Sequence, residues 1–231
     1  MTVAVAHDVW IFGYGSLMWR PGFAHLEACR ARLDGYHRAC CISSTHHRGT
    51  AARPGLVLGL DRGGACEGVA YRVAAVEAAA VLTYLRRREL ISGVYREGQV
   101  PVLLRDGSHR TVTALAYIVE RCHPSYIGRQ PLKVLAHQIR GACGVSGDNL
   151  DYLLATVQHL TTSGIREPDL VRLVALAAPH AANLLRAGHT SVSAAAIRRA
   201  TAHLPDPAVR MRRGDRMRFL YRVRLNGGTG S

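Results

Sequence analysis

The chain has 231 residues, of which 48% are apolar, and it carries a formal net charge of +14. This apolar content suffices for a packed core and excludes a chain that is disordered throughout, and no apolar run approaches the ~20 residues of a membrane-spanning helix. Much of the charge lies beyond residue 179, where ten Arg and two Asp give +8. With neither a reader helix nor an interleaved aromatic platform in view, the sequence argues against nucleic acid as a partner.

The N-terminal residues lack a basic stretch followed by an apolar segment, so we expect no secretory signal and a cytoplasmic location. No C-x-x-C spacing is present, which predicts reduced and mostly buried thiols. The six cysteines are Cys29, Cys40, Cys41, Cys66, Cys122 and Cys143.

Strands dominate the first 120 residues. Val9 to Phe12 is a short apolar strand that ends at Gly13, and Arg30 to Ser43 is a long one. The D-R-G-G segment, Asp61 to Gly64, predicts a hairpin, and the R-D-G-S segment, Arg105 to Ser108, predicts a second one. The segments flanking these turns are Leu56 to Leu60 and Glu67 to Val73 for the first, and Val100 to Leu104 and Arg110 to Val119 for the second.

About six mostly antiparallel strands favour a small closed β-barrel, because closure removes the unpaired edges. Val76 to Glu89 predicts a helix between the strands, and residues 131–143, 148–162 and 168–178 predict three more. We therefore expect an α+β fold, a barrel with flanking helices, over residues 1–178. Residues 179–231 form an Arg-rich appendage whose order the pattern does not decide.

The segment W-I-F-G-Y-G-S-L-M-W, Trp10 to Trp19, places small residues at the end of the first strand. It is no dinucleotide fingerprint, since Met18 stands at the third glycine position, and it lacks the G-K-[ST] of a phosphate loop. It also lacks the G-x-S-x-G of a nucleophile elbow. Two readings remain open: a turn whose N–H groups hold an anion such as a carboxylate, or glycines that permit close packing.

Glu89 extends the apolar stripe of the first helix, which runs through Ala78, Val81, Leu82 and Leu85 at helical spacing. An inward carboxylate at a helix C-terminus loses hydration and meets negative potential, and both effects raise its pKa. Such a group suits general acid–base work. The alternative is an ordinary salt bridge to a neighbouring arginine, or a frayed helix end that frees the side chain into water.

His46 and His47 are adjacent, so on a strand their side chains diverge, and no nearby acid or cysteine completes a metal site. Tyr95 and Tyr117 are candidate hydrogen-bond donors in a pocket, although lone tyrosines commonly serve packing.

Nine motifs in one order resemble the ChaC proteins, glutathione-specific γ-glutamylcyclotransferases, over about residues 9–178. The residues beyond Pro179 match no part of that family. The motifs are F-G-Y-G-S-L-M-W (12–19), H-R-G-T (47–50), R-P-G-L-V-L-G-L (53–60), G-V-A-Y-R-V (68–73), Y-L-R-R-R-E (84–89), G-V-Y-R (93–96), A-Y-I-V (116–119), H-P-S-Y-I-G (123–128) and S-G-D-N-L-D-Y-L (146–153).

The resemblance implies a small β-barrel with flanking helices that cleaves glutathione to 5-oxoproline and cysteinylglycine without metal or cofactor. It places the catalytic acid–base on Glu89. A related cyclotransferase for other γ-glutamyl amines or dipeptides, and a non-catalytic γ-glutamyl-binding protein, remain alternatives. The implied substrate-binding residues are those of the turn, Gly13, Tyr14, Gly15, Ser16, Leu17 and Met18, together with Tyr95, Tyr117, His47 and Arg48.

Overall fold

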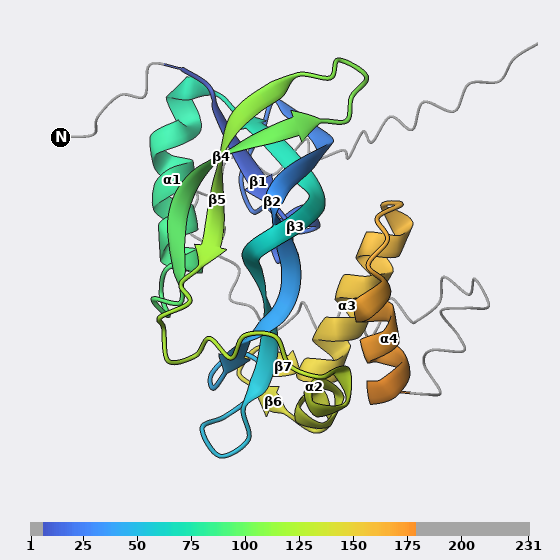
Figure 1. Ribbon diagram of the computed structural model, residues 1–231. Coiled ribbons are helices and arrows are strands. Elements are labelled where there is room, and N and C mark those ends of the chain that lie inside the picture. The colour runs from blue at the N-terminus through green and yellow to red at the C-terminus, as the bar shows by residue number, and fades with distance from the viewer. Residues whose placement is uncertain (1–6, 179–231) are drawn as a thin grey trace, which may run out of the picture.

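The computed structural model of the chain describes residues 7–178. Five strands form a closed barrel in the order β1-β3-β2-β4-β5 (Figure 1). The pairing of β1 with β5 is parallel and every other pair is antiparallel, which confirms the expected small, mostly antiparallel barrel. The strands are β1 (Val9–Gly13), β2 (Glu27–Ser44), β3 (Gly55–Val73), β4 (Tyr95–Leu104) and β5 (Thr111–Val119).

Helices flank the barrel on two sides. Figure 1 shows α1 along one side and the three later helices gathered beside the lower part of β3. Within residues 7–178, no helix is long and apolar enough to cross a membrane. The helical elements are η1 (Ser16–Met18), α1 (Ala75–Glu89), α2 (Leu132–Ile139), α3 (Asn149–Thr162) and α4 (Pro168–Ala177), and two short strands, β6 (Cys143–Gly144) and β7 (Gly147–Asp148), precede α3.

The prediction of a hairpin at Asp61 to Gly64 is wrong. These residues lie inside β3, a single strand of 19 residues that pairs with β2 along its length. The register passes from Ala65 opposite Asp34 to Arg62 opposite Tyr36, so the two glycines between them form a bulge. Gly63 and Gly64 have φ values of +99° and +70°, which a bulge accepts as readily as a reversing turn does. The barrel consequently has five strands and not six.

The second hairpin is confirmed, with β4 and β5 paired from Tyr95 opposite Val119 to Leu103 opposite Thr111. β4 also pairs with β2, at Leu103 and Leu104, next to the loop that contains Arg105 to Ser108. The predicted start at Val100 is too late, since β4 begins at Tyr95. The longer strand brings Tyr95 level with the end of β5.

The apolar side chains pack in two main layers. Inside and around the barrel, Ala78, Val81 and Leu85 of α1 are buried, as the helical stripe predicted, whereas Leu82 is only half-buried. On the other side, α2, α3 and α4 pack together over Leu56 and Leu58 of β3. The long strand β3 therefore belongs to both layers and joins them.

Arg38 of β2 is buried between the two layers. Its Nε donates to the carbonyl oxygen of Tyr14 at 2.5 Å, and its Nη2 donates to that of Glu67 at 2.6 Å. Its Nη1 pairs with Glu167, immediately before α4. One buried side chain thus fixes the turn after β1 against the sheet and against the helical layer.

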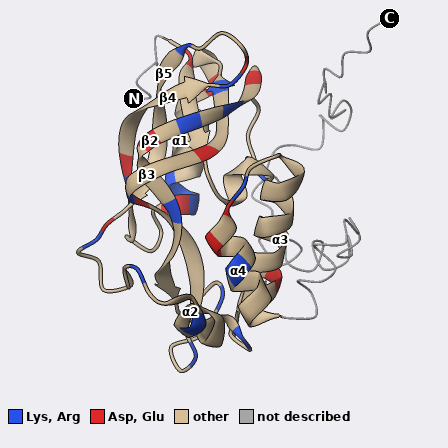
Figure 2. Cartoon of the chain, turned by 45° about the vertical axis from the view of Figure 1, so that its right-hand side comes forward, with Lys and Arg blue, Asp and Glu red and all other residues tan. Residues whose placement is uncertain are grey.

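Surface charges of both signs are interspersed along β2 and β3 (Figure 2), as in the pairs of Arg30 with Glu67 and Arg72 with Glu27. All six thiols are free. Cys40, Cys41 and Cys66 are buried, as expected, but Cys122 and Cys143 are exposed. The expectation that the cysteines are mostly buried is therefore wrong.

Candidate active site

The turn after β1 is built on two glycines with different tasks. A Cβ on Gly13 would lie 3.0 Å from Cβ of Leu17 and 3.3 Å from its backbone carbon, so Gly13 permits close packing. A Cβ on Gly15 would meet nothing within 4 Å, because Gly15 lines an open pocket. The chain then closes into η1, where the N–H of Met18 donates to the carbonyl oxygen of Gly15 at 2.9 Å. The close-packing reading therefore holds for Gly13, while Gly15 leaves space at the pocket.

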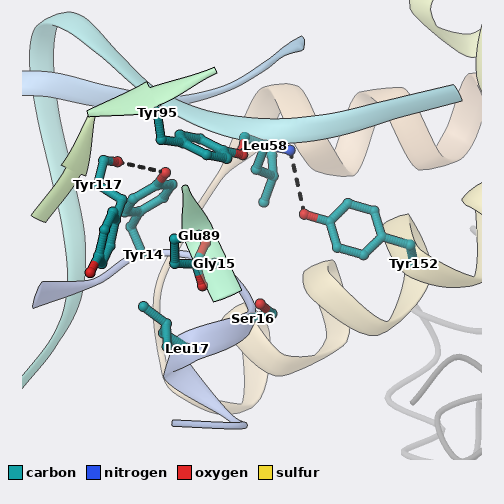
Figure 3. A pocket seen from close by; sticks show the side chains of 9 residues that line it. All are labelled: Tyr14, Gly15, Ser16, Leu17, Leu58, Glu89, Tyr95, Tyr117 and Tyr152. Atoms are coloured by element: carbon teal, nitrogen blue, oxygen red, sulfur yellow. Dashed lines mark hydrogen bonds between the residues drawn. The ribbon is translucent and has the colours of Figure 1, made fainter. Parts of the chain in front are cut away.

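The pocket is small, with a cavity volume of about 50 Å³, and it opens to solvent. Barrel strands, the turn, α1 and α3 all contribute walls to it (Figure 3). Its lining residues are Tyr14, Gly15, Ser16, Leu17, Leu58, Glu89, Tyr95, Tyr117 and Tyr152.

The turn that lines the pocket carries backbone N–H groups without a backbone acceptor among the described residues. Within the described part of the chain, the N–H groups of Gly15, Ser16 and Leu17 donate to no backbone oxygen. Successive N–H groups at the start of a helical turn attract an anion. The side chain of Ser16 is engaged, since Nη2 of Arg88 donates to its Oγ at 2.8 Å.

Glu89 ends α1 and its side chain is 19% exposed, with the carboxylate among the pocket residues in Figure 3. Burial raises the pKa of this carboxyl group, while the charge of Arg88 and its hydrogen bond oppose the shift. Nε of Arg88 lies 3.0 Å from Oε1 of Glu89. The inward orientation and the salt bridge, which the sequence offered as alternatives, therefore coexist, and the effect of burial on the pKa is the larger one.

Four tyrosines form most of the remaining wall. The hydroxyl of Tyr14 donates to the carbonyl oxygen of Tyr117 at 2.9 Å, and that of Tyr95 donates to the carbonyl oxygen of Leu58 at 2.6 Å. The hydroxyl of Tyr152 accepts from the N–H of Leu58 at 3.4 Å. Burial raises the pKa of Tyr14 and Tyr95 well above 10 and that of Tyr152 to about 12. The wall is therefore neutral at physiological pH, and its hydroxyls are held in place.

Seven of the predicted site residues line this pocket, and four do not. Gly13 lies under the turn, and Met18 is buried where its Sδ accepts from Arg38 at 3.7 Å. Nδ1 of His47 is 3.0 Å from Oγ of Ser146, outside the pocket lining. The seven lining residues are Tyr14, Gly15, Ser16, Leu17, Glu89, Tyr95 and Tyr117.

Arg48 is buried and contacts the pocket residue Tyr152 without lining the pocket itself. Its Cζ lies 4.9 Å from the centre of the Tyr152 ring, and its Nη1 donates to the carbonyl oxygen of Asp148 at 3.3 Å. The stacked guanidinium supports the ring from behind. The H-R-G-T segment therefore holds the helical side of the site in place.

Sequence reasoning missed Leu58, Tyr152 and Arg88. Leu58 lies in an expected strand and Tyr152 in an expected helix, but no local pattern indicates that these two elements meet at a pocket. Arg88 was visible only as one of three possible salt-bridge partners of Glu89, and its bond to Ser16 depends on tertiary packing.

One group outside this pocket has the spacing of metal ligands. Ligand atoms of Glu27, Cys29 and Asp106 lie within 4.8 Å of one another. Nη2 of Arg110 lies 3.9 Å from Glu27 and 3.4 Å from Asp106, so a cation of the protein already compensates these carboxylates. His46 and His47 do not belong to this group.

Comparison with known proteins gives one consistent result. A family model described as ChaC-like protein matches residues 9–178. A glutathione-specific γ-glutamylcyclotransferase of Escherichia coli is 42% identical over 162 residues, which are 70% of this chain and 69% of that protein. The mouse protein named glutathione-specific γ-glutamylcyclotransferase 1 is 39% identical over 163 residues, which are 70% of this chain and 73% of the mouse protein. A yeast cyclotransferase crystal structure, described as specific to glutathione, shares the fold with a TM-score of 0.68 at 23% identity, covering 75% of this chain and 97% of that one.

Proposed function

Because the chain belongs to the ChaC-like protein family, we propose that it degrades glutathione, cleaving the γ-glutamyl bond to give 5-oxoproline and cysteinylglycine. The relatives named for this activity support the substrate. The observation that carries the proposal is that Glu89 and residues 15–17, whose N–H groups donate to no backbone oxygen of the described residues, line one pocket.

The reaction is intramolecular. The α-amine of the γ-glutamyl group attacks its own γ-carbonyl carbon, a five-membered ring closes, and the bond from that carbon to the cysteinyl nitrogen breaks. No protein nucleophile is needed. Fixing the conformation that brings the amine to the carbonyl contributes about 7–11 kcal/mol in well-oriented cases.

The turn supplies that conformation. The N–H groups of Gly15, Ser16 and Leu17 hold the α-carboxylate of the γ-glutamyl group, which fixes the amine beside the γ-carbonyl. Ser16 serves as a hydrogen-bonding spacer and not as a nucleophile, because its Oγ already accepts from Arg88.

Glu89 moves the proton. Its ionised carboxylate takes a proton from the substrate ammonium, which frees the amine for attack, and returns it to the cysteinyl nitrogen as the C–N bond breaks. The ring nitrogen, positively charged after the attack, loses a second proton to the same carboxylate, which passes it to the released cysteinylglycine amine. The charge of the carboxyl group is therefore the same before and after each turnover. A carboxyl group with a raised pKa is suited to both steps, since that pKa lies closer to the working pH than the pKa of an ordinary glutamate does.

The test is release of 5-oxoproline from glutathione by the purified chain. We expect Glu89→Gln to lower kcat about 10²–10⁴-fold. Glu77→Gln, at the exposed start of the same helix, is the matched control and should keep the wild-type rate. An inactive wild-type chain, or full activity in Glu89→Gln, would contradict the proposal, and faster turnover of γ-glutamyl-alanine than of glutathione would reassign the substrate.

A further inference from the structure

Arg88 contacts both parts of the proposed machinery at once. Its side chain is 18% exposed and lies between the end of α1 and the turn after β1. Nε is 3.0 Å from Oε1 of Glu89, and Nη2 donates to Oγ of Ser16 at 2.8 Å. A single planar guanidinium therefore spans from the carboxylate to the turn.

The remaining nitrogen anchors the guanidinium to the segment that follows η1. Nη1 donates to the carbonyl oxygens of Arg20 at 2.6 Å and Pro21 at 3.3 Å. It also donates to the hydroxyl of Tyr84, one helical turn back on α1, at 2.9 Å. With all three nitrogens engaged, the plane of the group is fixed. A lysine ammonium has no fork of this shape and cannot make the same set of contacts.

We propose that Arg88 is the positioning residue of this site, holding the Glu89 carboxylate at a fixed place relative to the Ser16 turn. This inference rests on the proposed function, in which the turn grips the substrate carboxylate and Glu89 handles its ammonium proton. Ser16 and Arg88 are 72 residues apart in sequence, so a direct contact between them is needed to fix the distance between the turn and the Glu89 carboxylate. Misplacement of reacting groups by about 1 Å can cost about 10²-fold in rate.

The same contact controls the charge of Glu89. Burial disfavours its ionised form and the positive charge of Arg88 favours it, so removing that charge leaves the effect of burial unopposed and the pKa of Glu89 rises further. Arg88 lies on the same helix as Glu89. The titratable groups that face Glu89 from other elements are the neutral hydroxyls of Tyr14, Tyr95, Tyr117 and Tyr152.

Three variants separate charge from shape. Arg88→Gln removes the charge and the fork, so we expect the acid-side midpoint of the kcat/KM profile to move up by about one pH unit and KM for glutathione to rise. Arg88→Lys keeps the charge and should hold the midpoint near its wild-type value while still raising KM. Arg87→Gln makes the same charge change on the adjacent exposed residue, and it should leave both quantities unchanged.

A measurement without substrate makes the inference independent of turnover. The Glu89 carboxyl carbon is titrated by ¹³C NMR in the ligand-free protein and assigned by its absence in Glu89→Gln. A wild-type chain that forms no 5-oxoproline refutes the proposed function, whereas the NMR midpoint still tests the hold of Arg88 on Glu89. An unchanged midpoint in Arg88→Gln, or an equal shift in Arg87→Gln, would overturn the inference. Should Arg88→Gln fail to fold, a wild-type KM in Arg88→Lys would overturn it.

Discussion

At the scale of the residue, the proposed role of Glu89 makes its raised pKa the property that limits the pH range of the reaction. Burial makes protonation easier than in an ordinary glutamate, whose pKa is about 4.3. In the proposed mechanism, only the ionised carboxylate accepts the substrate proton. As the pH falls through the folded-state pKa, the base form is lost and turnover falls with it.

We therefore expect the kcat/KM profile of the wild-type chain to fall on the acid side with a midpoint above about 4.3. Initial rates of 5-oxoproline release across buffers of constant ionic strength give this midpoint. The native state binds the Glu89 proton more tightly than the unfolded chain does. Protonated Glu89 therefore contributes its full stabilisation at pH values below the pKa of the unfolded state, and this contribution is lost as the pH rises through the pKa of the folded state. A midpoint at or below that of an ordinary glutamate would contradict the assignment.

Glu89 could be predicted from sequence because its signal is local. A stripe of apolar residues at helical spacing says which way the next residue on that face points, and Val81 and Leu85 of that stripe are buried. Tyr152 carried no such signal. Its place in the pocket depends on how α3 docks against β3, and that docking involves contacts between residues more than ninety positions apart.

At the scale of the element, the length of β3 was the main feature that sequence reasoning missed. Tandem glycines such as Gly63 and Gly64 supply positive φ, which a two-residue hairpin and a bulge both require. What decides between them is pairing with β2, a property of the whole sheet. The continuous strand matters to the site, because its far part carries Leu58 to the pocket.

Asn149 at the start of α3 joins that helix to β3. Its side-chain amide donates to the carbonyl oxygen of Leu56 at 2.7 Å and accepts from the N–H of the same residue at 2.7 Å, in the manner of a neighbouring strand. Asn149→Ala would leave both buried backbone groups without these partners. We expect the free energy of unfolding to fall by about 2–3 kcal/mol, measured by urea denaturation.

Gln138→Ala is the matched control for this change, since it also removes a side-chain amide that bonds β3. That amide is only half-buried and donates to the carbonyl oxygen of Gly55 at 3.3 Å, so the loss should be smaller. An equal loss of unfolding free energy in the two variants would show that the paired hydrogen bonds of Asn149 stabilise the fold no more than the single bond of Gln138 does. Because α3 carries Tyr152, KM for glutathione should rise only in Asn149→Ala.

At the scale of the whole molecule, the pocket needs both layers of the fold. The barrel and its turn supply most of the lining residues, α1 supplies Glu89, and the helical layer supplies Tyr152. Arg38 and Arg48 tie the layers together from behind the pocket wall. Such an arrangement cannot be read from any one segment. The order of motifs along the chain predicted the family and its fold, but not which side chains close the pocket.

We propose that residues 1–178 contain everything the reaction requires, because the pocket formed by the described residues and the whole family match lie within them. The predicted appendage, residues 179–231, lies outside the described residues. A chain ending at Ala178 should then keep the kcat/KM and the thermal midpoint of the full chain, compared by 5-oxoproline release and by circular dichroism. A severalfold loss of activity would instead assign those residues a part in the site. Removing these residues also removes a net charge of +8. If the full chain binds duplex DNA with a steep salt dependence and the shorter chain does not, the arginines of this segment have a separate role.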